Sequence, residues 1–411
     1  MANPNSPHDA QKTLADLRDH LARHDKPIAF LFGAGASCAV RVAVPGEGGG
    51  TQPIIPAVVG LTALCKADAL KLGQNYAAAW ELIEAQCTTN NLDPNIENIL
   101  SRLRVMLVAI GQDDTLAGLN KKEIGELEES VRKTIAREVT PDLVNITGDY
   151  PHRRFARWLV KTSRQNPIEI FTLNYDVLLE HALESERIPV FDGFVGGYRP
   201  FFLPDSLRRL ESAPGANWTR LWKMHGSVTW RRVEQDGRTR VVRGEPDLAG
   251  EMIFPSFEKY DESRQQPYSA FVDRLSRFLD QDDALLIVVG FSFGDDHINN
   301  HIFEALENKP RTHVYALQFD ELPDDNSLVK RAQNMNNLIL IGPQKGIIGG
   351  RIAEWMPVES PSFMSDVFEL KVENIQGGGE GDGDSQEVKT GVMKIGDFES
   401  FSCFLQSMIA G

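Results

Sequence analysis

Cysteine is scarce in this sequence of 411 residues, and its four copies lie far apart. They stand at Cys38, Cys65, Cys87 and Cys403, and no two of them form a Cys-x-x-Cys pair. A structural zinc ribbon needs its ligands in close pairs, so this spacing argues against one. Widely separated cysteines are also typical of reduced thiols, and we therefore expect a cytoplasmic protein.

Long apolar runs are lacking as well. The longest, residues 284–291, has the length of a core strand, whereas a helix needs roughly 18 apolar residues to cross a bilayer. The first ten residues are polar, so we expect no secretory signal. Neither feature predicts contact with a membrane.

Positive charge is in deficit, since 43 Lys and Arg face 58 Asp and Glu, for a net charge of −15. Neutralising a phosphate backbone requires a surplus of Lys and Arg, so this balance disfavours direct binding of nucleic acid. Five arginines do lie close together, and we interpret them as part of a solvated hairpin. They are Arg231, Arg232, Arg238, Arg240 and Arg243.

Among the features that are present, one stretch near the start organises the rest. Five apolar residues, 28–32, predict a buried strand, and Gly33-Ala34-Gly35-Ala36-Ser37 follows it directly. Glycines at such a point allow a sharp turn into a helix and a close approach of a ligand such as a pyrophosphate. The same turn also occurs in sheets that bind no nucleotide.

Further strands alternate with helices along the chain. Helices are expected over 13–24, 151–163, 177–186, 297–308 and 326–336, and strands over 168–173, 284–289, 313–317 and 338–341. This alternation predicts an α/β fold with a Rossmann-like, doubly wound parallel sheet. Ligands of such sheets bind at the carboxyl ends of the strands.

The chain also predicts two additions to the sheet. Residues 57–165 form a mostly α-helical insertion, with helical periodicity over 57–70, 76–87, 95–110 and 120–138. Residues 187–260 are irregular and β-rich. We place the main domain at 1–345 and a C-terminal extension at 346–411. The extension holds a strand at 367–372, a flexible acidic loop at 377–384 and a helix at 398–409, which could dock on the body or on a partner.

Three more polar motifs occur further along the chain. Thr172-Leu173-Asn174-Tyr175-Asp176 and Gly290-Phe291-Ser292 follow predicted strands, and Lys223-Met224-His225-Gly226 lies in the irregular, β-rich region. Each has an ordinary structural explanation. Asn174 could cap the next helix, Asp176 could interact with its dipole, and a backbone group could satisfy His225. A carboxamide, a carboxylate and a near-neutral imidazole together also suit the cleavage of a cationic glycosidic bond, because a neutral leaving group needs no strong acid.

In their order and rough spacing over residues 28–345, these four motifs resemble the sirtuin superfamily. The resemblance implies NAD as substrate. It implies that Asn174, His225 and Asp176 are catalytic, with His225 as the general base. The implied NAD-binding residues are Gly33, Ala34, Gly35, Ala36, Ser37, Thr172, Gly290 and Ser292.

The sequence departs from sirtuin deacylases because it lacks their four zinc-binding cysteines and their Gly-x-Pro-x-Phe-Arg segment. With its helical insertion it is similar to the zinc-free, sirtuin-like effectors of bacterial antiphage defence, which cleave NAD outright. The resemblance further implies a homo-oligomer and a HerA-type ATPase partner. Two alternatives stay open: an NAD-dependent deacylase or ADP-ribosyltransferase, and a non-catalytic subunit that binds NAD or ADP-ribose.

A metal is not expected. His297 and His301 have the i, i+4 spacing of zinc ligands on a helix, but Ile298 stands where the catalytic Glu of a metalloprotease would be. Asp295 and Asp296 just before them are better explained as the start of a capped helix. Alternating Asp and Gly over 377–384 lacks the spaced ligands of a calcium loop, and we interpret it as a solvated linker.

Overall fold

In the computed structural model, the described residues are 6–44, 50–143, 146, 148–208, 213–235, 237–246, 251–252, 266–358, 364–376 and 385–409. The acidic segment predicted as a flexible loop, 377–384, lies outside them.

A nine-stranded sheet forms the centre of the molecule, in the order β19-β18-β17-β16-β15-β1-β6-β10-β7. Its strands are β1 (Ile28–Phe32), β6 (Glu169–Thr172), β7 (Val190–Phe191), β10 (Thr219–Lys223), β15 (Leu285–Val289), β16 (His313–Leu317), β17 (Leu338–Ile341), β18 (Lys345–Ile348) and β19 (Arg351–Glu354). Neighbours from β7 to β17 run parallel, whereas β18 and β19 form an antiparallel hairpin at the edge.

The chain winds outward from β1 in both directions, which confirms the predicted α/β, Rossmann-like class. It first builds β6, β7 and β10 on one side of β1, and then returns to build β15, β16 and β17 on the other. The order therefore reverses between β1 and β15. Both strands are buried along their whole length, as the unbroken apolar sequence of a central parallel strand requires.

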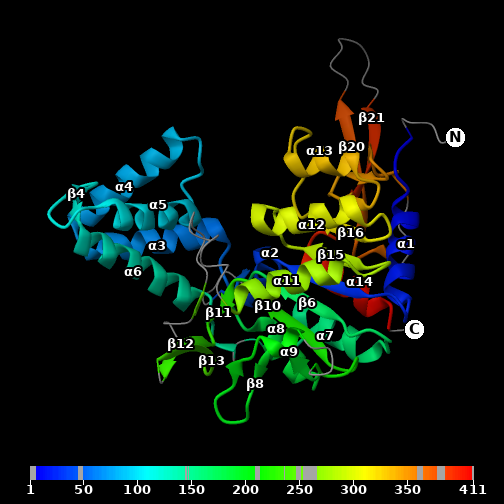
Figure 1. The fold of residues 1–411 in the computed structure, drawn as a ribbon. Coiled ribbons are helices and arrows are strands. Elements are labelled where there is room, and N and C mark those ends of the chain that lie inside the picture. The colour runs from blue at the N-terminus through cyan, green and yellow to red at the C-terminus, as the bar shows by residue number, and fades with distance from the viewer. Residues whose placement is uncertain are drawn as a thin grey trace.

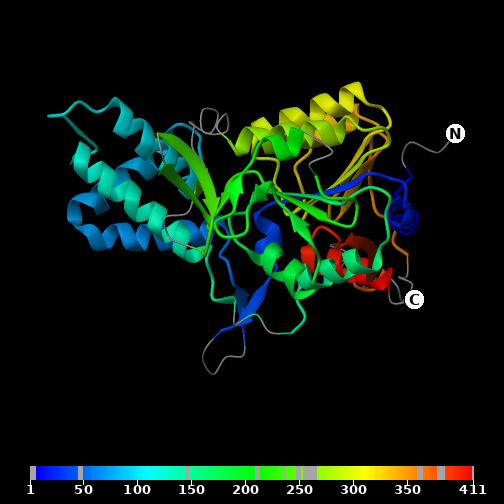
Figure 2. The same ribbon diagram turned by 60° about the horizontal axis from the view of Figure 1, so that its bottom comes forward.

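Helices cover both faces of the sheet, and the alternation of side chains along β1 separates two cores. Phe30 and Phe32 pack on the side of α1 (Ala10–Ala22), α7 (Pro151–Lys161), α8 (Leu178–Ser185) and α14 (Phe398–Ser407). Ala29 and Leu31 pack on the side of α11 (Tyr268–Leu279), α12 (Asp296–Asn308) and α13 (Ser327–Asn334). Figure 2 shows the sheet between these two layers. The sequence analysis missed α11, although its apolar residues have helical spacing.

Four helices between β1 and β6 form a bundle that stands to one side of the sheet in both views (Figures 1 and 2). They are α3 (Val58–Leu72), α4 (Gln74–Thr89), α5 (Ile96–Ala109) and α6 (Lys121–Glu138). Each corresponds to one of the predicted helices. Asn120 and Glu123 form a capping box at the start of α6, which explains why the start of this helix could be predicted from the sequence. The boundaries 57–165, 1–345 and 346–411 stay predictions.

Downstream of the parallel strands, β20 (Phe368–Gln376) and β21 (Ser385–Met393) pair as a hairpin that projects from the body (Figure 1). Helix α14 follows and docks on the body. The Phe398 ring lies 5.0 Å from that of Phe32, and Arg154 of α7 forms ion pairs with Glu399 and with Asp149. The apolar face of this helix is therefore covered within the same chain.

The remaining elements are short and lie in the connections. They are α2 (Ala34–Cys38), β2 (Arg41–Ala43), β3 (Thr51–Pro53), β4 (Thr115–Leu116), β5 (Leu119–Asn120), β8 (Phe194–Val195), β9 (Phe201–Phe202), α9 (Asp205–Arg208), β11 (Gly226–Ser227), β12 (Trp230–Gln235), β13 (Arg238–Arg243) and β14 (Glu251–Met252). The pairing of β12 with β13 confirms the hairpin expected around the five arginines.

Candidate active site

All four sequence motifs lie at the carboxyl edge of the sheet. Gly33 follows β1, Asn174 follows β6, His225 follows β10 and Gly290 follows β15, and these four strands are neighbours in the order β15-β1-β6-β10. The motifs are spread over more than half of the chain, and the topology gathers them on one side. This edge, next to the reversal of strand order, is where ligands of doubly wound sheets bind.

The two glycine motifs pack directly against each other. The Gly33 amide donates to Val289 O at 3.0 Å, and the Gly35 amide donates to Gly290 O at 2.9 Å. A Cβ on Gly33 would lie 2.4 Å from Gly290 O, and Gly290 itself has a φ of +66°. Side chains are therefore excluded here by backbone packing alone. Ala34 and Gly35 remain exposed on the outer side of the turn.

Asn174 is held in one orientation. Its Nδ2 donates to Gly33 O at 2.9 Å and to Ser37 Oγ at 2.8 Å, and its backbone amide donates to Thr172 Oγ1 at 3.1 Å. A backbone carbonyl can only accept, so the NH₂ group must face Gly33. Both amide hydrogens are engaged by Gly33 O and Ser37 Oγ, so Oδ1, on the other side of the carboxamide, is the atom with which the side chain can accept a hydrogen bond.

Ser37 and Asp176 are turned into the protein. They are 2% and 5% exposed, and Ser37 Oγ donates to Asp176 Oδ2 at 2.6 Å. The other carboxylate oxygen, Oδ1, accepts the amide hydrogen of Leu178 at 3.0 Å, at the start of α8. The sequence had suggested both a catalytic role and a helix-dipole role for Asp176. In the structure its carboxylate fixes Ser37, which in turn fixes Asn174.

Below these residues lies a buried charged cluster. Lys223 Nζ donates to the backbone oxygen of Asp176 and lies 2.9 Å from Glu180 Oε1. Burial raises the pKa of the Glu180 carboxyl, which the Lys223 ammonium partly opposes. Burial also lowers the pKa of His152 to about 4, against the pull of the Asp176 carboxylate. Among the described residues, Glu180 Oε2 and His152 Nδ1 have no hydrogen-bond partner.

His225 lies beside the Asn174 loop and reaches across the edge. The rings of Tyr175 and His225 are 6.5 Å apart, and the Val228 amide donates to Tyr175 O at 3.1 Å. His225 Nε2 lies 3.1 Å from Asp295 Oδ2, and its side chain is 13% exposed. Asp295 belongs to the loop after β15, so this contact spans the full width of the four-strand edge.

The structure thus brings Asn174, Ser37, Asp176, Thr172 and Gly33 into direct contact. His225 and the Gly290 loop join them at the same edge, while Ser292 is exposed there. The catalytic and NAD-binding roles assigned to these residues stay predictions.

Sequence reasoning missed Asp295 and Lys223 as parts of the site. Asp295 was interpreted only as a helix cap, which it also is, since Oδ1 accepts from the His297 amide at 3.1 Å and from the Ile298 amide at 3.4 Å. Lys223 carried a signal that could have been used, because a lysine that directly follows the apolar pair Leu221-Trp222 must find a counter-charge if it is buried.

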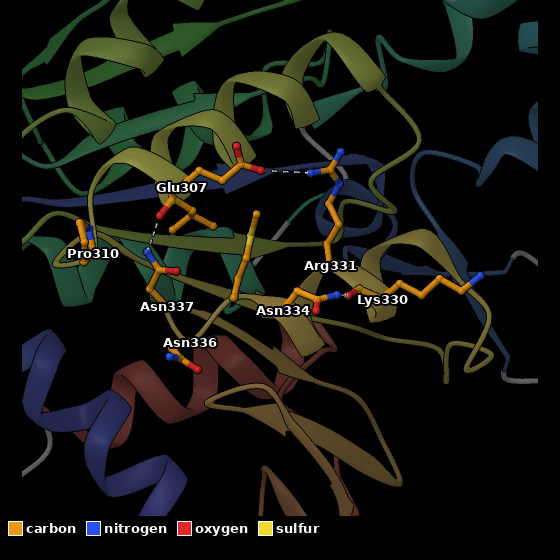
Figure 3. A pocket seen from close by; sticks show the side chains of 9 residues that line it. Glu307, Pro310, Lys330, Arg331, Asn334, Asn336 and Asn337 are labelled. Atoms are coloured by element: carbon orange, nitrogen blue, oxygen red, sulfur yellow. Dashed lines mark hydrogen bonds and ion pairs between the residues drawn. The ribbon is translucent and has the colours of Figure 1, made fainter.

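Two features outside the edge bear on ligands. The rings of His297 and His301 lie 5.1 Å apart in a T-shaped arrangement, and no cluster of three or more potential metal ligands occurs among the described residues. A cavity of about 520 Å³ lies between α12 and α13, with Leu306, Pro310 and Arg331 in its wall (Figure 3). Asn337 closes it by donating to the carbonyls of Leu306, Lys309 and Thr312. It opens where β16 and β17 begin, so it lies at the opposite edge from the motifs.

Comparison with known proteins agrees with the geometry. A family model, SIR2-like domain, matches residues 168–339. This segment holds three of the four motifs and excludes the Gly33 loop, and it spans less than half of the chain. The match supports a sirtuin-like fold and NAD-related activity. A search of curated proteins finds no match. No helix in the described part of the chain has both the length and the apolar character to span a bilayer.

Proposed function

We propose that this protein is an NAD⁺ glycohydrolase, which uses water to split NAD into nicotinamide and ADP-ribose. The observation that carries the proposal is the fixed orientation of Asn174, whose two amide hydrogens bond inward to Gly33 O and Ser37 Oγ. Its Oδ1 can accept a hydrogen bond from a ribose hydroxyl or from an attacking water. A residue that only capped a helix would not need its amide locked from the inner side.

The reaction requires little acid catalysis, because the nicotinamide of NAD leaves a cationic glycosidic bond as a neutral molecule. What remains is to stabilise positive charge on the ribose and to remove a proton from the attacking oxygen. Asn174 Oδ1 orients that oxygen, and the His225 imidazole accepts the proton. Asp176 and Ser37 act through Asn174 as positioning residues.

The residues at the edge fit a dinucleotide. Ala34, Gly35 and Ser292 are exposed at the same edge as Asn174, and the close packing of Gly33 against Gly290 leaves no room for a side chain at either glycine. Gly33, Ala34, Gly35 and Ala36 would hold the pyrophosphate, and Gly290 with Ser292 would contact the adenosine side. Thr172 supports the Asn174 loop from within.

The arrangement of the cysteines favours hydrolysis of NAD over deacylation as the reaction. All four are free thiols in separate elements, and the described residues hold no metal-binding cluster. Sirtuin deacylases use a zinc module to shape the groove for acyl-lysine. The sequence lacks the cysteines of this module, so we favour NAD cleavage by water over deacylation.

The biological setting that we propose is abortive infection in antiphage defence, in the cytoplasm, by a homo-oligomer that assembles with a HerA-type ATPase. Its support is the resemblance to zinc-free, sirtuin-like effectors in the order of motifs and in the helical insertion. Depletion of NAD by such an enzyme would arrest the infected cell.

The test is product analysis with purified protein and NAD. We expect nicotinamide and free ADP-ribose in equal amounts, and a loss on the order of 10²-fold or more in Asn174→Ala and in His225→Ala. Asn308→Ala, at the exposed end of α12, is the matched control and should retain full turnover.

Other products would contradict the proposal. O-acyl-ADP-ribose formed with an acylated peptide would indicate a deacylase, and ADP-ribosylated protein would indicate a transferase. Stoichiometric retention of intact NAD without turnover would indicate a binding subunit.

A further inference from the structure

Asp295 contacts the imidazole that the proposed reaction uses as its base. Its Oδ2 lies 3.1 Å from His225 Nε2, and the Asp295 residue and the His225 side chain are 9% and 13% exposed. Asp295 follows β15 and His225 follows β10, so β1 and β6 lie between them in the sheet. A contact across two strands depends on the whole edge and is not a by-product of local sequence.

We propose that Asp295 is a positioning residue for His225, an inference that rests on the proposed function. A carboxylate can only accept, so the ring nitrogen that faces it carries the hydrogen. Asp295 therefore holds the neutral imidazole as the Nε2–H tautomer, and Nδ1 is left as the basic nitrogen.

The carboxylate is itself held in place by α12. Its Oδ1 accepts from the His297 amide at 3.1 Å and from the Ile298 amide at 3.4 Å, in the first turn of this helix of 13 residues. The partial positive charge of the helix start favours the ionised form of a carboxylate there. One oxygen thus serves the helix and the other serves His225, so that the imidazole is tied to a rigid element.

This arrangement determines how the proton and the electrons move when water attacks NAD. An O–H bond of water breaks, its proton forms a bond to Nδ1, and the electron pair left on oxygen attacks the anomeric carbon of NAD. The bond from that carbon to the nicotinamide nitrogen breaks, and its electrons neutralise the pyridinium. The imidazolium that results lies against the Asp295 carboxylate. The Tyr175 ring also lies near His225, with 6.5 Å between the ring centroids.

The test is Asp295→Asn. Asparagine also caps helices well, so α12 keeps its start while the charge is removed. Asp296→Asn makes the same change one residue further on, at an exposed position of the same helix turn, and is the matched control. If Asp295→Asn does not fold, Asp295→Ser retains a capping side chain and replaces it.

The first readout is the nitrogen-15 spectrum of histidine-labelled protein at neutral pH, with the His225 signals assigned by their loss in His225→Gln. We expect a protonated Nε2 and an unprotonated Nδ1 in the native protein and in Asp296→Asn. In Asp295→Asn the two signals should move toward the mixed values of exchanging tautomers. Unchanged signals in Asp295→Asn would overturn the proposal.

The second readout is the kinetics of nicotinamide release. We expect kcat to fall on the order of 10²-fold in Asp295→Asn, with KM changed by less than about threefold. Unaltered or faster turnover would also overturn the proposal, the latter because the carboxylate would then be restraining His225. A native protein that cleaves no NAD would refute the proposed function, and the spectrum alone would still decide the role of Asp295.

Discussion

Buried charges lie near both ends of the neighbouring strands β6 and β10, with Glu169 and Arg220 at the amino end and Lys223 at the carboxyl end. The two ends are built differently. At the amino end, Glu169 is 2% exposed and both of its oxygens are engaged. Arg274 Nε donates to Oε2 at 2.7 Å and a second guanidinium nitrogen donates to Oε1. Trp222 Nε1 donates to Oε2 at 2.8 Å, and Arg220 lies 3.6 Å from Oε1.

At the carboxyl end the polar groups are only partly engaged. Asn174 Oδ1 stays available as an acceptor, and Glu180 Oε2 and His152 Nδ1 lack partners among the described residues. At the amino end Arg220 Nε also lacks a partner among the described residues, but both oxygens of Glu169 are engaged, and breaking these contacts would leave buried charges unpaired. The amino end therefore serves stability. The partly engaged polar groups at the carboxyl end can still bind a ligand and accept or donate protons. The difference between the ends therefore predicts which mutations change stability and which change turnover.

The largest loss of stability is expected for Glu169→Ala. It leaves the largely buried guanidinium groups of Arg220 and Arg274 without their counter-charge, and should cost about 3–5 kcal/mol in the free energy of unfolding. Urea denaturation measures this loss. Turnover of NAD per folded molecule should stay within about twofold of the native value, because the amino end takes no part in the chemistry.

Glu307→Ala is the control for this change. Its exposed carboxylate lies 3.6 Å from Arg331, and a solvated pair of this kind contributes less than about 1 kcal/mol. If the two substitutions lowered the free energy of unfolding equally, the buried ion pairs of Glu169 would contribute no more to stability than an ordinary surface pair.

Low pH should reduce the stability of the protein through protonation of His152, at the carboxyl end of the strands. Its pKa is about 4 in the folded protein against about 6.5 when unfolded, so between these values the unfolded chain binds the extra proton. Stability should therefore fall as the pH drops from 6.5 toward 4, by about 3 kcal/mol. The raised pKa of Glu180 works in the opposite direction, because the folded state then binds a proton more readily.

His152→Leu isolates this contribution, since leucine fills a similar volume and does not titrate. The difference in unfolding free energy between native protein and variant, followed by urea denaturation from pH 7 to pH 4, should show the decline. A difference independent of pH would mean that His152 is not held neutral by burial.

Among the substitutions of buried residues, the smallest change in stability is expected for Ser37→Ala, with a large change in turnover. Asp176 Oδ2 loses the hydroxyl donor at 2.6 Å, which costs about 1–2 kcal/mol. Asn174 also loses one of its two inward acceptors, so its amide can turn and its Oδ1 is no longer held in one orientation. We expect nicotinamide release to fall at least tenfold. Native turnover in this variant would show that the inward bonds of Asn174 are unimportant.

The central sheet was predictable because its strands are continuous apolar runs. Residues 285–289 and 28–32 have no amphipathic pattern, as expected of strands buried on both faces, and the glycines that follow mark their ends. Helix α6 was predictable from its capping box. By contrast, α11 begins directly after Pro267, and the helical spacing of its apolar residues was overlooked.

The partners within the site were not predictable from sequence. Asn174 and Asp176 stand in one motif, but their link through Ser37 joins positions 137 and 139 residues apart. The contact of His225 with Asp295 depends on which strands become neighbours, and periodicity does not encode strand order. Asp295 also caps a helix, and because the cap was enough to explain this residue, its contact with His225 was not predicted.

The position of α14 on β1 has a consequence for folding during synthesis on the ribosome. Phe398 and Phe401 of this helix cover Phe32 and Phe30 of β1, the strand that carries the first glycine loop. A ribosome adding about 5–20 residues per second reaches α14 roughly 20 to 70 s after completing β1. Until then β1 lacks this cover from α14, and on that face Phe30 and Phe32 can pack on Phe155 of α7.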